Sequence, residues 1–143
     1  IDALNNAKNA NVALLSKRQL VLALADQTIH ARGKSDTAKI YSLISKRILG
    51  ITPTPGTNML GSFAHITGGY DASYYGYMYS LVFAADMYET RFKDNIFDPK
   101  TGLDYRNIIL KPGGSKDFLL VLKEFLGRDC KPDAFYRSKG LQV

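Results

Sequence analysis

The sequence predicts a mainly α, multi-helical fold, and two observations support this prediction. Apolar residues recur at helical spacing in several segments, and residues that begin or end helices flank these segments. No stretch of alternating polar and apolar residues is long enough to indicate a sheet. The chain has 143 residues and is 45% hydrophobic, so it is long enough to bury a core. Because we see no internal repeat and no linker, we expect a single helical domain over residues 1–143.

The first long helix is predicted from Asn11 to Ala31. The segment ARGKSD, which begins at Ala31, closes it with a loop. His30, near the end of this helix, is interpreted as bonding the last backbone carbonyls. The apolar positions of the helix recur at helical spacing and are Leu15, Leu22, Ala25 and Ile29.

A second helix is predicted to follow Asp36, because an aspartate there can accept hydrogen bonds from the first free N–H groups. Gly50 can take the left-handed conformation that often ends a helix. The loop that follows, residues 51–62, is rich in proline and glycine, and a loop of this length in a compact domain is more often functional than idle. The apolar stripe of the second helix comprises Ile40, Leu43, Ile44 and Ile48.

Further helices are predicted in the second half of the chain. Residues 80–92 contain few helix breakers, and residues 101–110 indicate another helix, which the segment PGG ends. Ser115 is expected to cap the next helix, and Gly127 is expected to end it. A last short helix is predicted to begin near Pro132 or Asp133. The apolar stripe after Ser115 comprises Phe118, Val121, Leu122 and Phe125.

The segment from Phe63 to Tyr79, FAHITGGYDASYYGYMY, concentrates five phenols behind a pair of glycines. We expect Asp71 to cap a helix that runs on from Ala72. Helical spacing would place Tyr74, Tyr77 and Met78 on one face, and Tyr75 and Tyr79 on another.

The paired glycines of this segment, Gly68 and Gly69, permit positive φ and backbone motion, as in a loop that closes over a ligand. We therefore expect the run from Gly56 to Gly69 to have few core contacts and little protection from hydrogen exchange. The alternative is that the tyrosine rings pack in the core and that their hydroxyls bond backbone groups.

Composition limits the class of protein. The longest purely apolar run, LVLALA, is too short to span a bilayer, and no signal segment opens the chain. One cysteine cannot form an internal disulfide, so a reducing compartment fits best. Cys130 has no histidine nearby in sequence to activate it, and the two histidines form no metal-binding motif. The formal charge is +6, but basic residues alternate with acidic ones, which is typical of solvated helix faces.

Four segments together resemble one known family. TPGTNM, FAHITGGYDASYYGY, DYRNIILKPGGS and FLGRDCKPDAFYRSKGL are similar, in order and spacing, to the end of the thimet oligopeptidase and neurolysin family of zinc metallopeptidases. The resemblance implies mostly helical enzymes whose deep channel admits short peptides. It also implies that zinc is held by a His-Glu-x-x-His helix and a glutamate upstream of this region. The chain is thus interpreted as the C-terminal part of the catalytic half, a fragment that lacks the zinc site and is inactive alone.

The resemblance also implies roles for residues of the tyrosine segment. Tyr77 would donate a hydrogen bond to the tetrahedral oxyanion, and Tyr70 would be a second donor near the scissile bond. The zinc would belong to the full-length enzyme, and this fragment would bind none. The substrate-binding loop would contain His65, Gly68, Gly69 and Tyr74.

The expected partners follow from the same resemblance. They are short peptide substrates and the missing upstream region of the same protein, with no nucleic acid and no membrane. A fragment that exposes the surface normally covered by that region is expected to self-associate. The expected location is cytoplasmic, with the mitochondrion left open. The alternative function is a self-contained basic helical module that binds nucleic acid or a protein partner.

Overall fold

The structure is a computed structural model that describes the backbone of all 143 residues and every side chain except those of residues 2, 5, 6 and 8. Helices and no strands are found along the described backbone, which confirms the mainly α class. The chain divides into two compact units, Ile1–Tyr79 and Ser80–Val143. The expectation of a single domain stays a prediction. None of the described helices combines the length and apolar character needed to cross a membrane.

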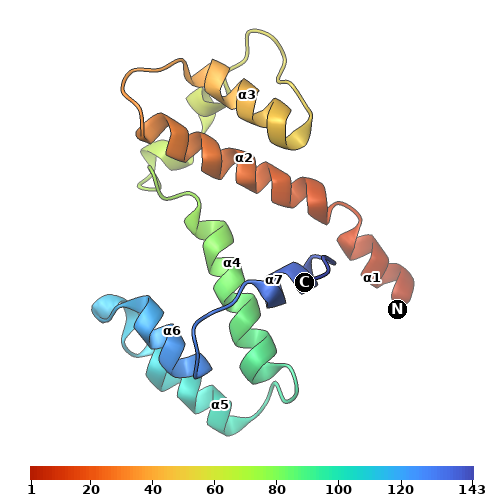
Figure 1. The fold of residues 1–143 in the computed structure, drawn as a ribbon, viewed down its shortest axis with the longest axis vertical. Coiled ribbons are helices and arrows are strands. Elements are labelled where there is room, and N and C mark those ends of the chain that lie inside the picture. Colours follow the sequence, from red (N-terminus) through yellow and green to blue (C-terminus); the bar gives the residue numbers. More distant parts are fainter. The chain divides into compact units, whose positions relative to one another are not determined.

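The first unit contains the predicted long helices. The helix expected from Asn11 to Ala31 is confirmed as α2, and α3 lies beside it (Figure 1). The cap predicted for α3 is also confirmed, because the Asp36 carboxylate accepts a hydrogen bond from the Lys39 N–H at 3.0 Å. Gly50 ends α3 with φ of 76°. The helical elements are α1 (Asp2–Asn9), α2 (Val12–His30), α3 (Thr37–Leu49) and the 3₁₀ turns η1 (Met59–Ser62) and η2 (Ala64–Thr67).

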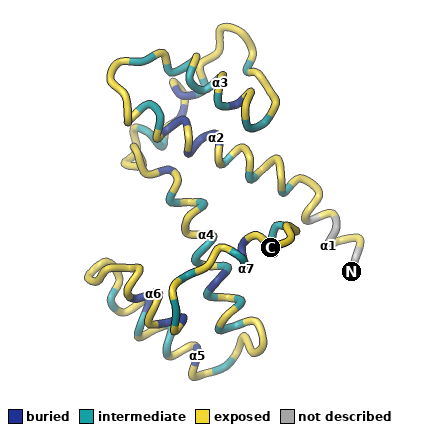
Figure 2. The backbone as a smooth tube through the Cα atoms, viewed as in Figure 1, coloured by how far each residue is buried: buried dark blue, intermediate teal, exposed yellow. Residues whose placement is uncertain are grey.

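The core of the first unit lies between the second half of α2 and the segment after α3. Figure 2 shows α2 largely exposed over its first half, and its buried residues lie between 21 and 26. Leu60 and Phe63 are each only 7% exposed and belong to the core cluster. The expectation that the run from Gly56 to Gly69 has few core contacts is therefore wrong, because short 3₁₀ turns direct these two apolar side chains inward. The buried members of this cluster are Leu22, Ala23, Ala25, Leu60, Phe63 and Tyr74.

The second unit contains the other predicted helices. The boundary between the units falls within α4 (Gly76–Met87), whose last part continues as a π-helix, η3 (Tyr88–Phe92). The predicted cap at Ser115 is wrong: Asp117 caps α6 by accepting from the Leu119 N–H at 2.8 Å, while the Ser115 hydroxyl donates to the Pro112 carbonyl. The remaining elements are α5 (Pro99–Asp104), the π-helix η4 (Tyr105–Leu110), the 3₁₀ turn η5 (Gly113–Ser115), α6 (Phe118–Leu126) and α7 (Asp133–Ser138).

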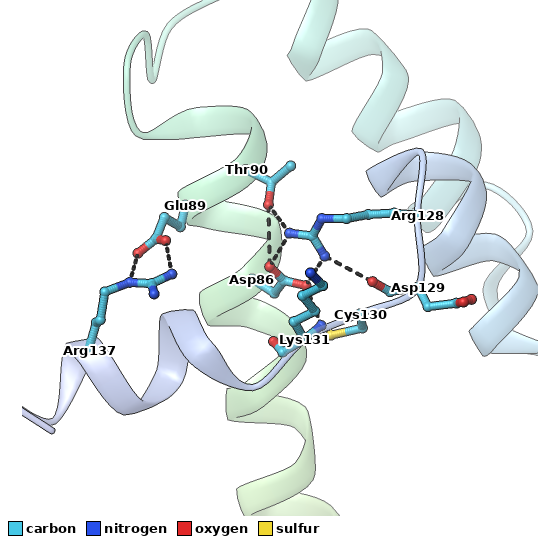
Figure 3. Close-up of polar contacts among 8 residues, drawn as sticks. All are labelled: Asp86, Glu89, Thr90, Arg128, Asp129, Cys130, Lys131 and Arg137. Atoms are coloured by element: carbon cyan, nitrogen blue, oxygen red, sulfur yellow. Dashed lines mark hydrogen bonds and ion pairs between the residues drawn. The ribbon is translucent and has the colours of Figure 1, made fainter. Parts of the chain in front are cut away.

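A buried carboxylate joins α4 to the segment after α6 (Figure 3). The Arg128 guanidinium donates to both Asp86 oxygens, at 2.7 and 2.8 Å, and the Lys131 N–H donates to one of them at 2.8 Å. The neighbouring Cys130 thiol is partly buried, and burial, followed by a hydrogen bond to Asp86, raises its pKa to about 11. Because the thiolate is the reactive form, this cysteine is a poor nucleophile at neutral pH.

Candidate functional site

Glycine is required at positions 68 and 69 for different structural reasons. Gly69 has φ of 86°, which side-chain-bearing residues rarely adopt. Gly68 is close to the preceding turn, since a Cβ added there would lie 3.1 Å from the Ala64 carbonyl oxygen. The His65 carbonyl accepts from the N–H groups of both Gly68 and Tyr70, at 3.2 and 3.1 Å. The glycine pair thus makes a tight turn that returns the chain toward His65.

This turn gathers five rings, which we call the aromatic cluster: Phe63, His65, Tyr70, Tyr74 and Tyr77. Tyr70 and Tyr77 stack, with ring centroids 5.2 Å apart and an interplanar angle of 23°. The His65 ring lies edge-on to both, at 5.6 and 5.8 Å. Tyr74 contacts Tyr77 at 5.0 Å and Phe63 at 4.9 Å. The structure therefore brings together the side chains that the sequence singled out.

The aromatic cluster has a buried base and an exposed pair. Phe63 and Tyr74 are each 7% exposed, whereas Tyr70 and Tyr77 are 44% and 41% exposed. The Tyr74 hydroxyl donates to the Gln19 side-chain oxygen at 2.9 Å, so this phenol is engaged within the fold. The hydroxyl-bearing rings that solvent or a ligand can reach are consequently those of Tyr70 and Tyr77.

Tyr77, one of the two exposed phenols, remains protonated at neutral pH. A hydrogen bond with the Tyr70 side chain, assisted by partial desolvation and by the Tyr70 and Tyr74 phenols, raises the pKa of Tyr77 to about 12. A pKa rises when the neutral form is the one stabilised, so the protonated form of the Tyr77 phenol is favoured. Tyr77 therefore presents a neutral hydroxyl donor, which suits a ligand atom that gains negative charge.

The chain between the glycines and α4 differs from the prediction. Asp71 is exposed and does not cap a helix from Ala72; residues 71–75 form turns, and the α-helix begins at Gly76. Ala72 has φ of 56°, which is incompatible with a right-handed helix. The physical reason is a contact from outside the segment. Asp26 of α2 accepts from the N–H groups of Ala72 and Tyr74, both at 3.0 Å, in place of a local cap.

The predicted pairing of phenols holds even though the helix begins later. Tyr74 contacts Tyr77, and Tyr75 contacts Tyr79, with the latter centroids 6.2 Å apart. Turn residues 74 and 75 are followed directly by helix, so spacings of three and four residues still place these rings together.

Asp26 is the residue of this site that sequence reasoning missed. It is fully buried, and the His30 Nδ1 lies 2.9 Å from its Oδ1 atom. The prediction for His30 is confirmed as well, since its Nδ1 contacts the Asp26 backbone carbonyl at 2.8 Å. A usable signal was present: Asp26 is the only charged residue in the segment QLVLALADQTI. A carboxylate on an otherwise apolar helix face requires polar partners from elsewhere in the fold.

The described side chains form no metal site. Within the part of the chain whose side chains are described, no group of three or more His, Cys, Asp and Glu residues could hold a metal ion. The ring of His65 lies among the aromatic rings of Phe63, Tyr70, Tyr74 and Tyr77. The described residues thus do not fit a zinc ion.

The sequence identifies the family of this chain. Residues 1–141 match the sequence model of Peptidase family M3, and the chain belongs to this family.

Three relatives illustrate the similarity. Saccharolysin of Saccharomyces cerevisiae is 38% identical over 147 residues, covering 99% of this chain and 21% of saccharolysin. Thimet-like oligopeptidase of Dictyostelium discoideum is 38% identical, covering 94% of this chain and 20% of the relative. Oligopeptidase A of Escherichia coli is 34% identical, covering 99% and 22%. The chain therefore spans about a fifth of the length of these relatives.

Proposed function

We propose that this chain is part of a zinc-dependent oligopeptidase that hydrolyses peptide bonds in short peptides. Its contribution is the substrate-binding loop and the tyrosine donors that stabilise the oxyanion. Family membership and the oligopeptidase names of the relatives support the class of reaction. The observation that carries the proposal is the stacked, half-exposed pair Tyr70 and Tyr77, whose side chains are hydrogen-bonded to each other.

The phenols suit the charge that develops during peptide hydrolysis. Attack on the peptide carbonyl moves negative charge onto its oxygen, and donors placed at that oxygen stabilise the transition state more than the substrate. Tyr77, with a pKa of about 12, keeps its proton across the physiological range. It can therefore donate to the oxyanion without losing the proton to solvent.

The two exposed phenols have different parts in this proposal. As negative charge develops on the peptide oxygen, that oxygen becomes a stronger acceptor than a neutral phenol, and the Tyr77 hydroxyl turns toward it. Tyr77 thus acts mainly in the transition state, whereas Tyr70, which stacks on it, also contacts bound substrate.

The remaining site residues form the substrate-binding loop in this proposal. His65 lies edge-on to both exposed phenols, so its ring nitrogens can bond the peptide beside them. Gly69 leaves open space where a Cβ would stand, so a peptide backbone can approach there, while Gly68 permits the tight turn against the Ala64 carbonyl. Because the Tyr74 hydroxyl is taken by Gln19, its contribution would come from the ring that supports Tyr77.

The zinc of the proposed enzyme is held by residues outside this chain. The described residues offer no group that could hold it. We therefore expect the 143-residue chain alone to hydrolyse no peptide, with or without added zinc. Activity of the isolated chain toward a short peptide would contradict this division of roles.

The test is Tyr77→Phe in the complete peptidase that contains this chain. The ring and its stacking remain, and only the hydroxyl is lost. Removing one oxyanion donor should lower kcat by about 10²–10³, with a much smaller change in KM. Tyr70→Phe should give a milder loss divided between kcat and KM.

Tyr75→Phe provides a matched control, because this phenol is half-exposed, contacts Tyr79, and lies outside the aromatic cluster. It should leave kcat unchanged. Full kcat for Tyr77→Phe at saturating peptide, with normal zinc content and stability, would mean that the tyrosines have only a structural role.

The alternative of a basic binding module receives no comparable support. Arg91, Arg128 and Arg137 pair with acidic side chains within the second unit. RNA binding that weakened steeply with rising salt would favour the alternative.

A further inference from the structure

The turn before α4 is held by two neighbouring side chains of α2. The N–H of Ala72 donates to Asp26 Oδ1 at 3.0 Å, and its carbonyl accepts from the Gln27 side-chain amide at 2.5 Å. Ala72 is the only residue other than glycine for which the described backbone has positive φ. A left-handed alanine costs free energy and persists where its surroundings enforce it. Both polar backbone atoms of the strained residue are thus bound by α2.

The carboxylate of Asp26 uses both oxygens for this purpose. Oδ2 accepts from the Tyr74 N–H at 3.0 Å, while Oδ1 accepts from Ala72 and lies 2.9 Å from His30 Nδ1. Asp26 is 0% exposed, so water cannot replace a lost partner. A buried carboxylate costs free energy unless it is hydrogen-bonded. The Asp26 carboxylate and the N–H groups of the turn therefore depend on each other for their hydrogen bonds.

The residues held by α2 lie between the two exposed phenols in sequence. Tyr74 is fixed at its N–H by Asp26 and at its hydroxyl by Gln19. Its carbonyl accepts from the Tyr77 N–H at 3.2 Å, and its ring contacts the Tyr77 ring. On the other side, the Tyr70 carbonyl accepts from the Ser73 N–H at 3.1 Å. Contacts therefore run without interruption from Asp26 to both stacked rings.

We propose that Asp26 is a positioning residue for the tyrosine donors: by holding the N–H groups of Ala72 and Tyr74, it fixes the turn that sets Tyr70 against Tyr77. The inference rests on the proposed function for its catalytic consequence. The carboxylate itself touches no reacting atom, being buried under the turn. Its effect on the reaction is transmitted through the backbone of residues 72–74.

The first measurement uses Asp26→Asn in the complete peptidase. Asparagine keeps the size of the side chain but has an NH2 donor in place of one oxygen, so one of the two N–H groups loses its acceptor. Hydrogen exchange at Ala72 and Tyr74 should become faster. Displacing the phenols should lower kcat by about 10- to 10²-fold, because small misplacements of catalytic groups have effects of this size. KM should change less, since the lost alignment matters most in the transition state.

The second measurement is a double-mutant cycle with Tyr77→Phe. If Asp26 acts through the Tyr77 hydroxyl, Asp26→Asn should lower kcat by less than threefold in a Tyr77→Phe background, where about tenfold or more is lost in the wild type. A merely destabilising change would multiply with Tyr77→Phe instead.

Asp86→Asn is the matched control, because Asp86 is a helical aspartate of similar burial in the second unit. It should leave hydrogen exchange at Ala72 and Tyr74 unchanged, and its effect on kcat should multiply fully with that of Tyr77→Phe. If Asp26→Asn fails to fold, Gln27→Ala replaces it. Gln27 is exposed, so the variant should fold, and loss of its bond to the Ala72 carbonyl should lower kcat several-fold with the same coupling to Tyr77.

The outcomes separate the two proposals. Faster exchange at Ala72 and Tyr74 together with coupled kcat losses supports the positioning role. A low kcat for Tyr77→Phe combined with fully multiplicative losses overturns the role of Asp26 and leaves the proposed function standing. Full kcat for Tyr77→Phe overturns the proposed function, and the positioning role with it. Unchanged exchange at Ala72 and Tyr74 in Asp26→Asn overturns the positioning role alone.

Discussion

Among the side chains that the structure describes, each compact unit buries one helical aspartate, Asp26 in α2 and Asp86 in α4, and the two are partnered in different ways. Asp26 accepts from two backbone N–H groups of a strained turn and contacts one histidine. Asp86 faces the Arg128 guanidinium, which also donates to Thr90 (Figure 3). The same residue type thus organises a turn in one unit and an ion pair in the other.

The two carboxylates also differ in the kind of group that compensates their charge. The hydrogen bonds from Arg128, reinforced by the Lys131 N–H, hold the pKa of Asp86 well below its usual range, although burial opposes them. Asp26 instead relies chiefly on peptide dipoles, and these are available only while residues 72–74 keep their turn. The contrast indicates that Asp86 links α4 to the segment after α6, whereas Asp26 holds a local backbone conformation beside the aromatic cluster.

The largest expected effect comes from removing the cation. Asp86 is 2% exposed, so Arg128→Met would leave a buried charge without its main partner. Breaking a buried pair from one side typically costs about 3–5 kcal/mol of unfolding free energy. Urea unfolding monitored by hydrogen exchange in α6 should detect this loss in the second unit. The first unit should keep its exchange rates.

The control for that variant is Arg137→Met. Arg137 pairs with Glu89, but both side chains are substantially exposed, at 48% and 30%. Such a pair contributes at most about 1 kcal/mol. Equal destabilisation by the two variants would show that burial of Asp86 does not determine the strength of its pair.

The next expected effect is that of acid on Asp86. Because the folded pKa of Asp86 is lowered, its stabilising contribution is complete above the unfolded value of about 3.9 and is lost as the pH falls toward the folded value. We expect the second unit to lose about 2 kcal/mol from this group in acid. Asp86→Asn should flatten the pH dependence of unfolding. Identical acid profiles for wild type and variant would contradict the lowered pKa.

The helix-ending glycines should behave alike in both units. Gly50 ends α3 with φ of 76°, and Gly127 ends α6 with φ of 72°. No atom lies within 4 Å of an added Cβ at either position, so backbone strain is the main cost of alanine. Each substitution should destabilise its own unit by about 1 kcal/mol in thermal or urea unfolding. Clearly unequal losses would mean that the units differ in more than their buried aspartates.

The smallest expected effect is that of Ala72→Gly. Glycine removes the strain of a positive φ but gives the unfolded chain more freedom, so stability should rise by no more than about 1 kcal/mol. Because Asp26 still holds the N–H groups, exchange at Tyr74 should not change. A fall in stability would indicate that the alanine methyl group, rather than the turn itself, is needed here.

Local patterns allowed several elements to be predicted correctly. The Asp36 cap and the glycines that end α3 and α6 depend on atoms within four residues of each other. The choice between Ser115 and Asp117 could not be made in this way, because both residues are able to cap a helix. The structure selects Asp117, since the Ser115 hydroxyl is already bonded to the Pro112 carbonyl in a 3₁₀ turn.

The gathering of phenols was also predictable in part. Spacings of three and four residues place Tyr74 near Tyr77 and Tyr75 near Tyr79. The stacking of Tyr70 on Tyr77 was not predictable by spacing, since seven residues and a turn separate them. The segment with buried Leu60 and Phe63 was misjudged, because loop composition does not reveal which apolar side chains find a core.

The sequence by itself determined the helical class, the stripes and ends of the helices, and the supply of phenols next to a glycine pair. These features arise from interactions within one or two helical turns, so they can be read from neighbouring residues. Only the tertiary structure decided where α4 begins, which phenols remain exposed, and that Asp26 holds the turn between them. The hydrogen bonds of Asp26 join residues 46 and 48 positions apart. Such contacts depend on how α2 packs against the later segment, which no local pattern specifies.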